Sequence, residues 1–133
     1  GTLTSLQITN LHGTPITAIS GAGVGKVIKI IDSSAKLNYG GNNAFSSTVQ
    51  SIVLYFSTVL TTGWTVANSG GINATSTFFL LPGTPSTNPA AISNGSIDNA
   101  NINFYNPNVT EIAGNASNDN TITWSITYIT VSI

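Results

Sequence analysis

The chain has 133 residues, of which only 5% are charged: four acidic residues stand against three lysines, with one histidine and no cysteine. The absence of cysteine excludes disulfide bonds and thiolate metal sites, and a formal net charge of −1 excludes the basic surface with which proteins bind nucleic acid. The length predicts one domain over residues 1–133, and a hydrophobic fraction of 41% is sufficient to build its core.

Short runs of threonine, β-branched and aromatic residues, interrupted about every ten residues by glycine, asparagine, proline or serine, are typical of an all-β protein. No segment has a sustained helical period. The predicted strands, in chain order, are Leu3–Ile8, Ile16–Ile19, Lys26–Asp32, Lys36–Tyr39, Ser51–Ser57, Ser76–Leu81, Asn101–Tyr105, Val109–Ile112 and Thr121–Ile133. Strands of this number and length predict two packed antiparallel sheets.

The glycine-rich segment Gly21–Lys26 has some features of a phosphate-binding loop. However, Ser20 stands where that motif has its first glycine, and Val27 stands where it has the serine or threonine that binds the metal. A strand follows, and not the helix whose N-terminus would bind phosphate. We therefore predict a turn that leads into a strand. The segment Val27–Ile31 is apolar apart from Lys29, which predicts a strand buried on both faces.

The last predicted strand alternates clearly, with apolar side chains at every second position from Ile122 to Tyr128 and Ser or Thr between them. Beyond Tyr128 the phase changes, because aliphatic residues occupy what had been the polar face. Either a β-bulge shifts the register, or a second surface covers the end of the strand. We favour a neighbouring copy of the chain as that surface. The predicted oligomer interface consists of Ile129, Val131 and Ile133.

Few side chains are suited to chemistry. His12 is the only histidine, and no Gly-x-Ser-x-Gly motif or recognisable pair of catalytic carboxylates is present. The four carboxylates are Asp32, Asp98, Glu111 and Asp119. The segment Asn115–Asn120 offers oxygen ligands for Ca²⁺, but its single carboxylate is better explained by a hairpin turn. We predict no enzymatic activity, no cofactor and no metal, with a hydrolase as the least favoured hypothesis.

Most aromatic residues stand in predicted strands next to aliphatic residues, which favours the core. Trp64 and Tyr105 are the exceptions, because Gly63 and Asn106-Pro107 place them beside loops. These two aromatics are the candidates for stacking on a ligand under the alternative hypothesis of glycan binding.

Five short motifs near the two ends of the chain occur together. They are Thr14–Ile16, Gly23–Ile28, Leu37–Gly41, Gly114-Asn115 and Thr121–Tyr128. This combination of a Thr-Pro-Ile turn, a Gly-Lys turn opening a β-branched strand, a Leu-x-Tyr strand and a closing strand with tyrosine resembles small virion structural proteins of tailed bacteriophages. The resemblance does not include the middle of the chain. It implies a jelly roll or related sandwich that assembles as a trimer and decorates or cements heads, or forms fibre tips, without catalytic residues.

These features together predict a virion structural protein, specifically a decoration or cement protein on the outer surface of a phage capsid. Its expected partners are further copies of itself, as a homotrimer, and the major capsid protein. We expect no direct contact with nucleic acid, and none with a membrane, because no apolar run approaches the roughly 18 residues that cross a bilayer. The alternative function is that of the receptor- or glycan-binding tip of a phage fibre or spike.

Overall fold

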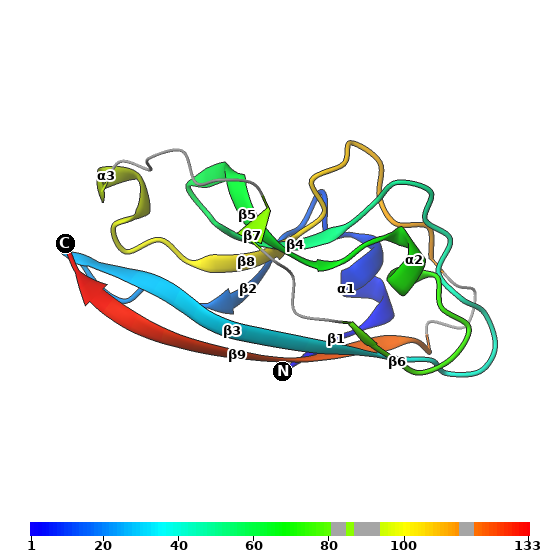
Figure 1. The fold of residues 1–133 in the computed structure, drawn as a ribbon. Coiled ribbons are helices and arrows are strands. Elements are labelled where there is room, and N and C mark those ends of the chain that lie inside the picture. Colours follow the sequence, from blue (N-terminus) through cyan, green and yellow to red (C-terminus); the bar gives the residue numbers. More distant parts are fainter. Residues whose placement is uncertain (81–84, 87–93, 115–118) are drawn as a thin grey trace.

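The computed structural model describes residues 1–80, 85–86, 94–114 and 119–133. The strands are β1 (Thr2–Leu3), β2 (Ile16–Ile19), β3 (Lys26–Asn38), β4 (Ile52–Phe56), β5 (Val59–Ala67), β6 (Phe78–Leu80), β7 (Pro85–Ser86), β8 (Ile102–Tyr105) and β9 (Thr121–Ser132). The helices are α1 (Ser5–Thr9), α2 (Ser69–Ile72) and α3 (Asn94–Ile97). The strands form two layers, with β3 and β9 running the length of one of them (Figure 1).

The order of the strands is that of a jelly roll. The first sheet has the order β1-β9-β3-β6 and the second β2-β8-β4-β5-β7, with every pairing antiparallel. When β7 is set aside and the remaining strands are lettered B to I along the chain, the sheets read B-I-D-G and C-H-E-F, the arrangement of an eight-stranded jelly roll. The two-residue β7 extends the second sheet beyond β5. The predicted all-β, two-sheet, jelly-roll-like sandwich is confirmed.

The core lies between the two sheets, where alternate residues of each strand point inward. In the second sheet, Leu54 of β4 pairs with Phe104 of β8, and both are fully buried. In the first sheet, Leu37 of β3 pairs with Ile122 of β9, and both are likewise fully buried. Because the paired residues of each sheet share a face, the two sheets press their aliphatic and aromatic side chains into a single cluster.

A β-bulge divides β3 into two halves. Ile30 pairs with Tyr128 and Asp32 pairs with Thr127, so Ile31 is an extra residue with no opposite partner. The phase of β3 changes there, while β9 continues without interruption. Ile31 faces outward, as Lys29 does, and is 54% exposed, so the prediction of a segment Val27–Ile31 buried on both faces is wrong.

Local signals that outweighed the alternation explain the other differences. Thr4 caps α1: its hydroxyl accepts a hydrogen bond from the Gln7 N–H, and the Gln7 side chain accepts one from the Thr4 N–H. This capping box turns the predicted strand Leu3–Ile8 into β1 followed by α1. The predicted strand Val109–Ile112 is also wrong, because the only pairing described there is an isolated bridge between Ala113 and Ser46.

Candidate interaction surface

The outer side of the first sheet carries an exposed aliphatic cluster, at the end where β3 begins and β9 finishes. We call this cluster the distal face; it consists of Val27, Ile31, Ile129, Val131 and Ile133. Val27 is half-buried, and the other four side chains are between 37% and 54% exposed. Val27 and Val131 are directly paired across the ladder, which places them side by side. The three residues of the predicted oligomer interface thus lie together on one exposed surface.

The distal face carries few charges. Lys29 pairs with Ile129, and Asp32 pairs with Thr127 at the inner border of the cluster. The whole of β9, together with Ile133, contains no charged residue. An aliphatic surface with one cation and one anion gains little from hydration. Its burial against another surface therefore lowers the free energy.

The glycine-rich loop before β3 extends this end of the molecule and is held by the segment between α3 and β8. Its backbone donates three hydrogen bonds: Gly21 N–H to Asn101 Oδ1 at 2.8 Å, Gly23 N–H to Asn99 Oδ1 at 2.8 Å and Gly25 N–H to Asp98 Oδ1 at 2.7 Å. These donors are therefore occupied within the protein, as expected for a structural turn. The loop presents Val24, which is 85% exposed, near the C-terminus, where the Ile133 N–H donates to the Gly25 carbonyl.

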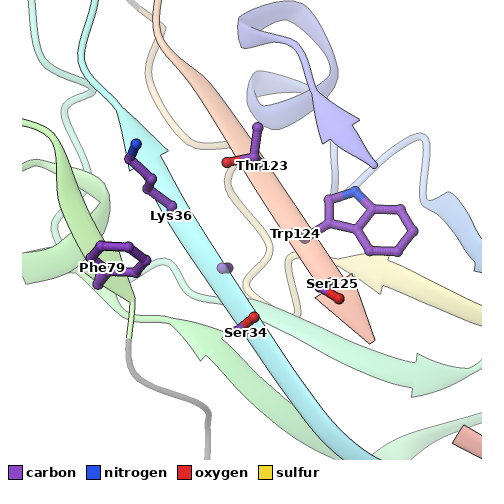
Figure 2. Close-up of a pocket in the computed structure, with 7 residues that line it drawn as sticks. Ser34, Lys36, Phe79, Thr123, Trp124 and Ser125 are labelled. Atoms are coloured by element: carbon purple, nitrogen blue, oxygen red, sulfur yellow. The ribbon is translucent and has the colours of Figure 1, made fainter. Parts of the chain in front are cut away.

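The middle of the same outer surface is polar. A shallow depression of about 260 Å³ lies between β6 and the β3–β9 ladder (Figure 2). Its lining consists of Ser34, Ala35, Lys36, Phe79, Thr123, Trp124 and Ser125. The Phe79 ring is 71% exposed, and Lys36 Nζ lies 5.9 Å from its centroid, a cation–π contact. The Trp124 ring points away from Phe79 and meets the Phe104 ring edge-on at 5.2 Å, on the core side of the sheet.

The two aromatic residues proposed for ligand stacking lie on opposite faces of the second sheet. Trp64 pairs with Leu54, and its ring packs against the core 6.4 Å from that of Phe56. Tyr105 points outward, where its ring contacts those of His12 and Tyr55 at centroid distances of 5.7 Å and 4.9 Å. The structure therefore does not bring Trp64 and Tyr105 into one site. Sequence reasoning missed the exposed ring of Phe79, whose place within an apolar run indicated the core.

The carboxylates that could take part in catalysis or metal binding accept hydrogen bonds from loops. The Glu111 carboxylate accepts hydrogen bonds from the backbone N–H groups of His12 at 2.9 Å and Gly13 at 2.7 Å. The Asp119 carboxylate accepts one from Asn42 at 2.7 Å. Of the segment Asn115–Asn120, which was predicted to be a hairpin turn and not a calcium site, residues 115–118 lie outside the described part of the chain. Among the described residues, no group of three or more His, Cys, Asp and Glu side chains is placed to hold a metal ion.

No protein-family model, curated protein or solved structure matches the chain. None of the helices in the described residues is long and apolar enough to cross a membrane. The distal face and the depression are thus the two surfaces on which a functional interpretation rests.

Proposed function

We propose that this protein is a non-enzymatic structural protein of a virus particle and acts as a decoration or cement protein on the outer surface of a phage capsid. The observation that carries the proposal is the distal face, an exposed aliphatic surface built on the two longest strands of the sandwich. Burying such a surface against a partner is favourable, because it removes apolar area from water. The proposed partners are the major capsid protein and further copies of the chain, for which the resemblance implies a trimer.

The fold is compatible with this function. Jelly rolls recur in viral capsid and lectin domains, although one fold serves many unrelated functions. The chemistry of the surface is therefore the stronger support. Hydroxyl and amide groups dominate the polar surface of this chain, and they match backbone groups of a partner without requiring charge pairs.

The carboxylates support a structural function in a second way. Asp98 and Glu111 both accept hydrogen bonds from backbone N–H groups of loops, so their charge is used to fix the fold. Neither carboxylate makes a hydrogen bond to a histidine side chain among the described contacts. A Ser-His-Asp arrangement would require such a contact.

The test is to prepare particles with and without this protein. Particles that lack it should lose heat or pressure resistance while still adsorbing to cells, and purified protein added back should restore resistance. Ile129→Asp should weaken that rebinding at least about tenfold, because the new carboxylate would be buried without a partner. Val109→Asp is the matched control, because Val109 is 88% exposed in a loop outside the distal face and its substitution should leave rebinding unchanged.

The second candidate function is that of a glycan-binding fibre tip, and the depression is the observation that favours it. An exposed phenyl ring beside hydroxyl groups and an amine is suited to stacking on a sugar and bonding its hydroxyls. If removal of the protein abolishes adsorption and leaves heads equally robust, and if glycan binding is lost in Phe79→Ala, the cement function is wrong and this function replaces it.

A further inference from the structure

The depression on the outer side of the first sheet is built from two rows of paired side chains. In one row, Lys36 of β3 lies between Phe79 of β6 and Thr123 of β9, its partners on the two neighbouring strands. In the other row, Ser34 of β3 is paired with Ser125 of β9. The rows are two residues apart along β3, so all five side chains project from the same face of the sheet (Figure 2).

The ammonium group of Lys36 is the only charged group in this depression. Among the described residues no carboxylate lines it, and Lys36 Nζ instead lies 5.9 Å from the centroid of the Phe79 ring. Asp32, on the same face of β3, is four residues away. That separation is roughly 13 Å of strand and exceeds the Debye length of about 8 Å at physiological ionic strength. Asp119, which precedes β9, accepts a hydrogen bond from Asn42. The ammonium group is therefore available to an anion from outside the protein.

The hydroxyl groups beside Lys36 are also available to a ligand. Ser34, Thr123 and Ser125 are exposed. Thr123 Oγ1 accepts a hydrogen bond from Asn38 Nδ2 at 3.3 Å, which leaves its own proton to donate. Neither serine hydroxyl makes a hydrogen bond among the described contacts. Hydroxyls that both donate and accept are matched by the hydroxyl groups of a sugar, which do the same.

The Phe79 ring supplies the apolar part of the site. Because neighbouring residues of a strand point to opposite faces, the burial of Leu80 in the core holds Phe79 on the outer face. A sugar ring has C–H groups on one face and hydroxyls around its rim, and its C–H face packs on an aromatic ring as other apolar surfaces do. The depression, of about 260 Å³, is smaller than the roughly 300 to 1,000 Å³ of sites for drug-sized ligands, which suits a single sugar ring.

We propose that the depression binds a sugar that carries one anionic group, a carboxylate or a sulfate, with the ring on Phe79 and the anion on Lys36. One cation matches one anion, whereas the many phosphates of a nucleic acid require more cations than this lining has. A peptide strand would need free backbone groups, and here β3 is already paired on both sides, with β6 and β9. The inference rests on the second candidate function, glycan binding at the depression, and names the class of glycan.

The test compares two sugars that differ in one group. Methyl glucuronide has a carboxylate where methyl glucoside has a hydroxymethyl group, and the rings are otherwise the same. In NMR titrations of the intact chain, both should bind with millimolar dissociation constants and shift the amide signals of Lys36 and Thr123. The glucuronide should bind about three- to tenfold more tightly, because it alone forms a charge-assisted hydrogen bond with the ammonium group. Glucose 6-sulfate is the third probe, and its affinity shows whether sulfate replaces the carboxylate.

Substitutions separate the two halves of the site. Lys36→Gln should remove the preference for the glucuronide and leave binding of the glucoside unchanged, whereas Lys36→Arg keeps the cation and should keep the preference. Phe79→Ala should weaken binding of both sugars at least about fivefold, because the ring contacts the part that they share. Lys29→Gln is the matched control. It removes the same charge from the same strand, outside the depression, and should change neither affinity.

The possible failures have different meanings. Equal binding of the glucuronide, the sulfate and the glucoside to the wild type, or a preference that survives in Lys36→Gln, would overturn the proposal and leave neutral glycan binding intact. If none of the three sugars binds, the proposal and the second candidate function are both wrong. A preference for the sulfate alone would support the proposal and identify sulfate as the anion. The cement function is tested on particles and is independent of these results.

Discussion

Tyr55 is almost completely buried, with 4% of its surface exposed, although it points away from the core between the sheets. Its neighbours on that outer side are the ring of Tyr105 and the side chain of Asn103, which is paired with it across the strands. Burial raises the pKa of the Tyr55 phenol above its ordinary value of 10.0 because the charged form would lose its hydration, and the polar side chain of Asn103 offsets only part of this effect.

The first prediction concerns the dependence of stability on pH. The raised pKa means that the folded protein holds the Tyr55 proton more tightly than the unfolded chain does. The resulting stability is fully present below pH 10 and is lost as the pH rises through the folded-state pKa. Urea unfolding at pH 8 and above pH 10 should therefore show a smaller alkaline loss in Tyr55→Phe than in the wild type. Equal losses in the two proteins would contradict the assignment.

Single residues also show why the site was only partly predictable. The alternation in Thr121–Ile133 placed Ile129, Val131 and Ile133 on one face, and the structure has them there. Phe79 could not be located in the same way. It stands in the run Phe78–Leu81, which is apolar throughout, so the side chain that faces outward depends on the pairing of Phe79 with Lys36, a long-range contact.

At the level of elements, four of the predicted strands match the structure closely. β2 agrees residue for residue with the prediction, and β4, β8 and β9 agree to within a residue at each end. β5 was missed because Leu60-Thr61-Thr62-Gly63 carries no alternation, and its position depends on pairing with β4. The two predicted strands Lys26–Asp32 and Lys36–Tyr39 form one strand, since the bulge allows β3 to continue past the polar Ser33-Ser34.

The second prediction concerns the contact between two elements, the loop before β3 and the segment after α3. Asp98 Oδ1 accepts hydrogen bonds from Gly25 N–H at 2.7 Å and Lys26 N–H at 3.3 Å. Asp98→Ala removes this acceptor and should lower the free energy of unfolding by about 1 to 2 kcal/mol, because the Gly25 N–H loses its partner and the Lys26 N–H keeps only the Gly23 carbonyl. Urea denaturation at neutral pH, with an unchanged slope, measures the difference.

The matched control for that prediction is Asp32→Ala. The Asp32 carboxylate is exposed and makes no hydrogen bond among the described contacts, so its removal should change the free energy of unfolding by less than about 0.5 kcal/mol. If both substitutions cost the same, the loop is not held through Asp98, and general loss of negative charge explains the effect.

For the whole molecule, the scarcity of charge has one consequence for every protein–protein contact proposed above. Only Lys29 and Asp32 lie at the distal face, and β9 has no charged residue, so neither the association of copies nor the attachment to a particle can rest on many ion pairs. Association must come from burial of aliphatic area and from backbone hydrogen bonds, and salt screens neither of these strongly.

The last prediction is that association is insensitive to salt. At about 1 M salt the Debye length falls to about 3 Å, which removes most of the attraction between exposed charges. The dissociation constant for association of the copies should nevertheless change less than about threefold between 0.1 M and 1 M NaCl, and particles that carry the protein should retain it through a wash at about 1 M. Sedimentation at the two salt concentrations measures the first quantity, and gel analysis of washed particles the second. Release of the protein by salt alone would show that charged groups hold it in place. That result would contradict attachment through the aliphatic distal face.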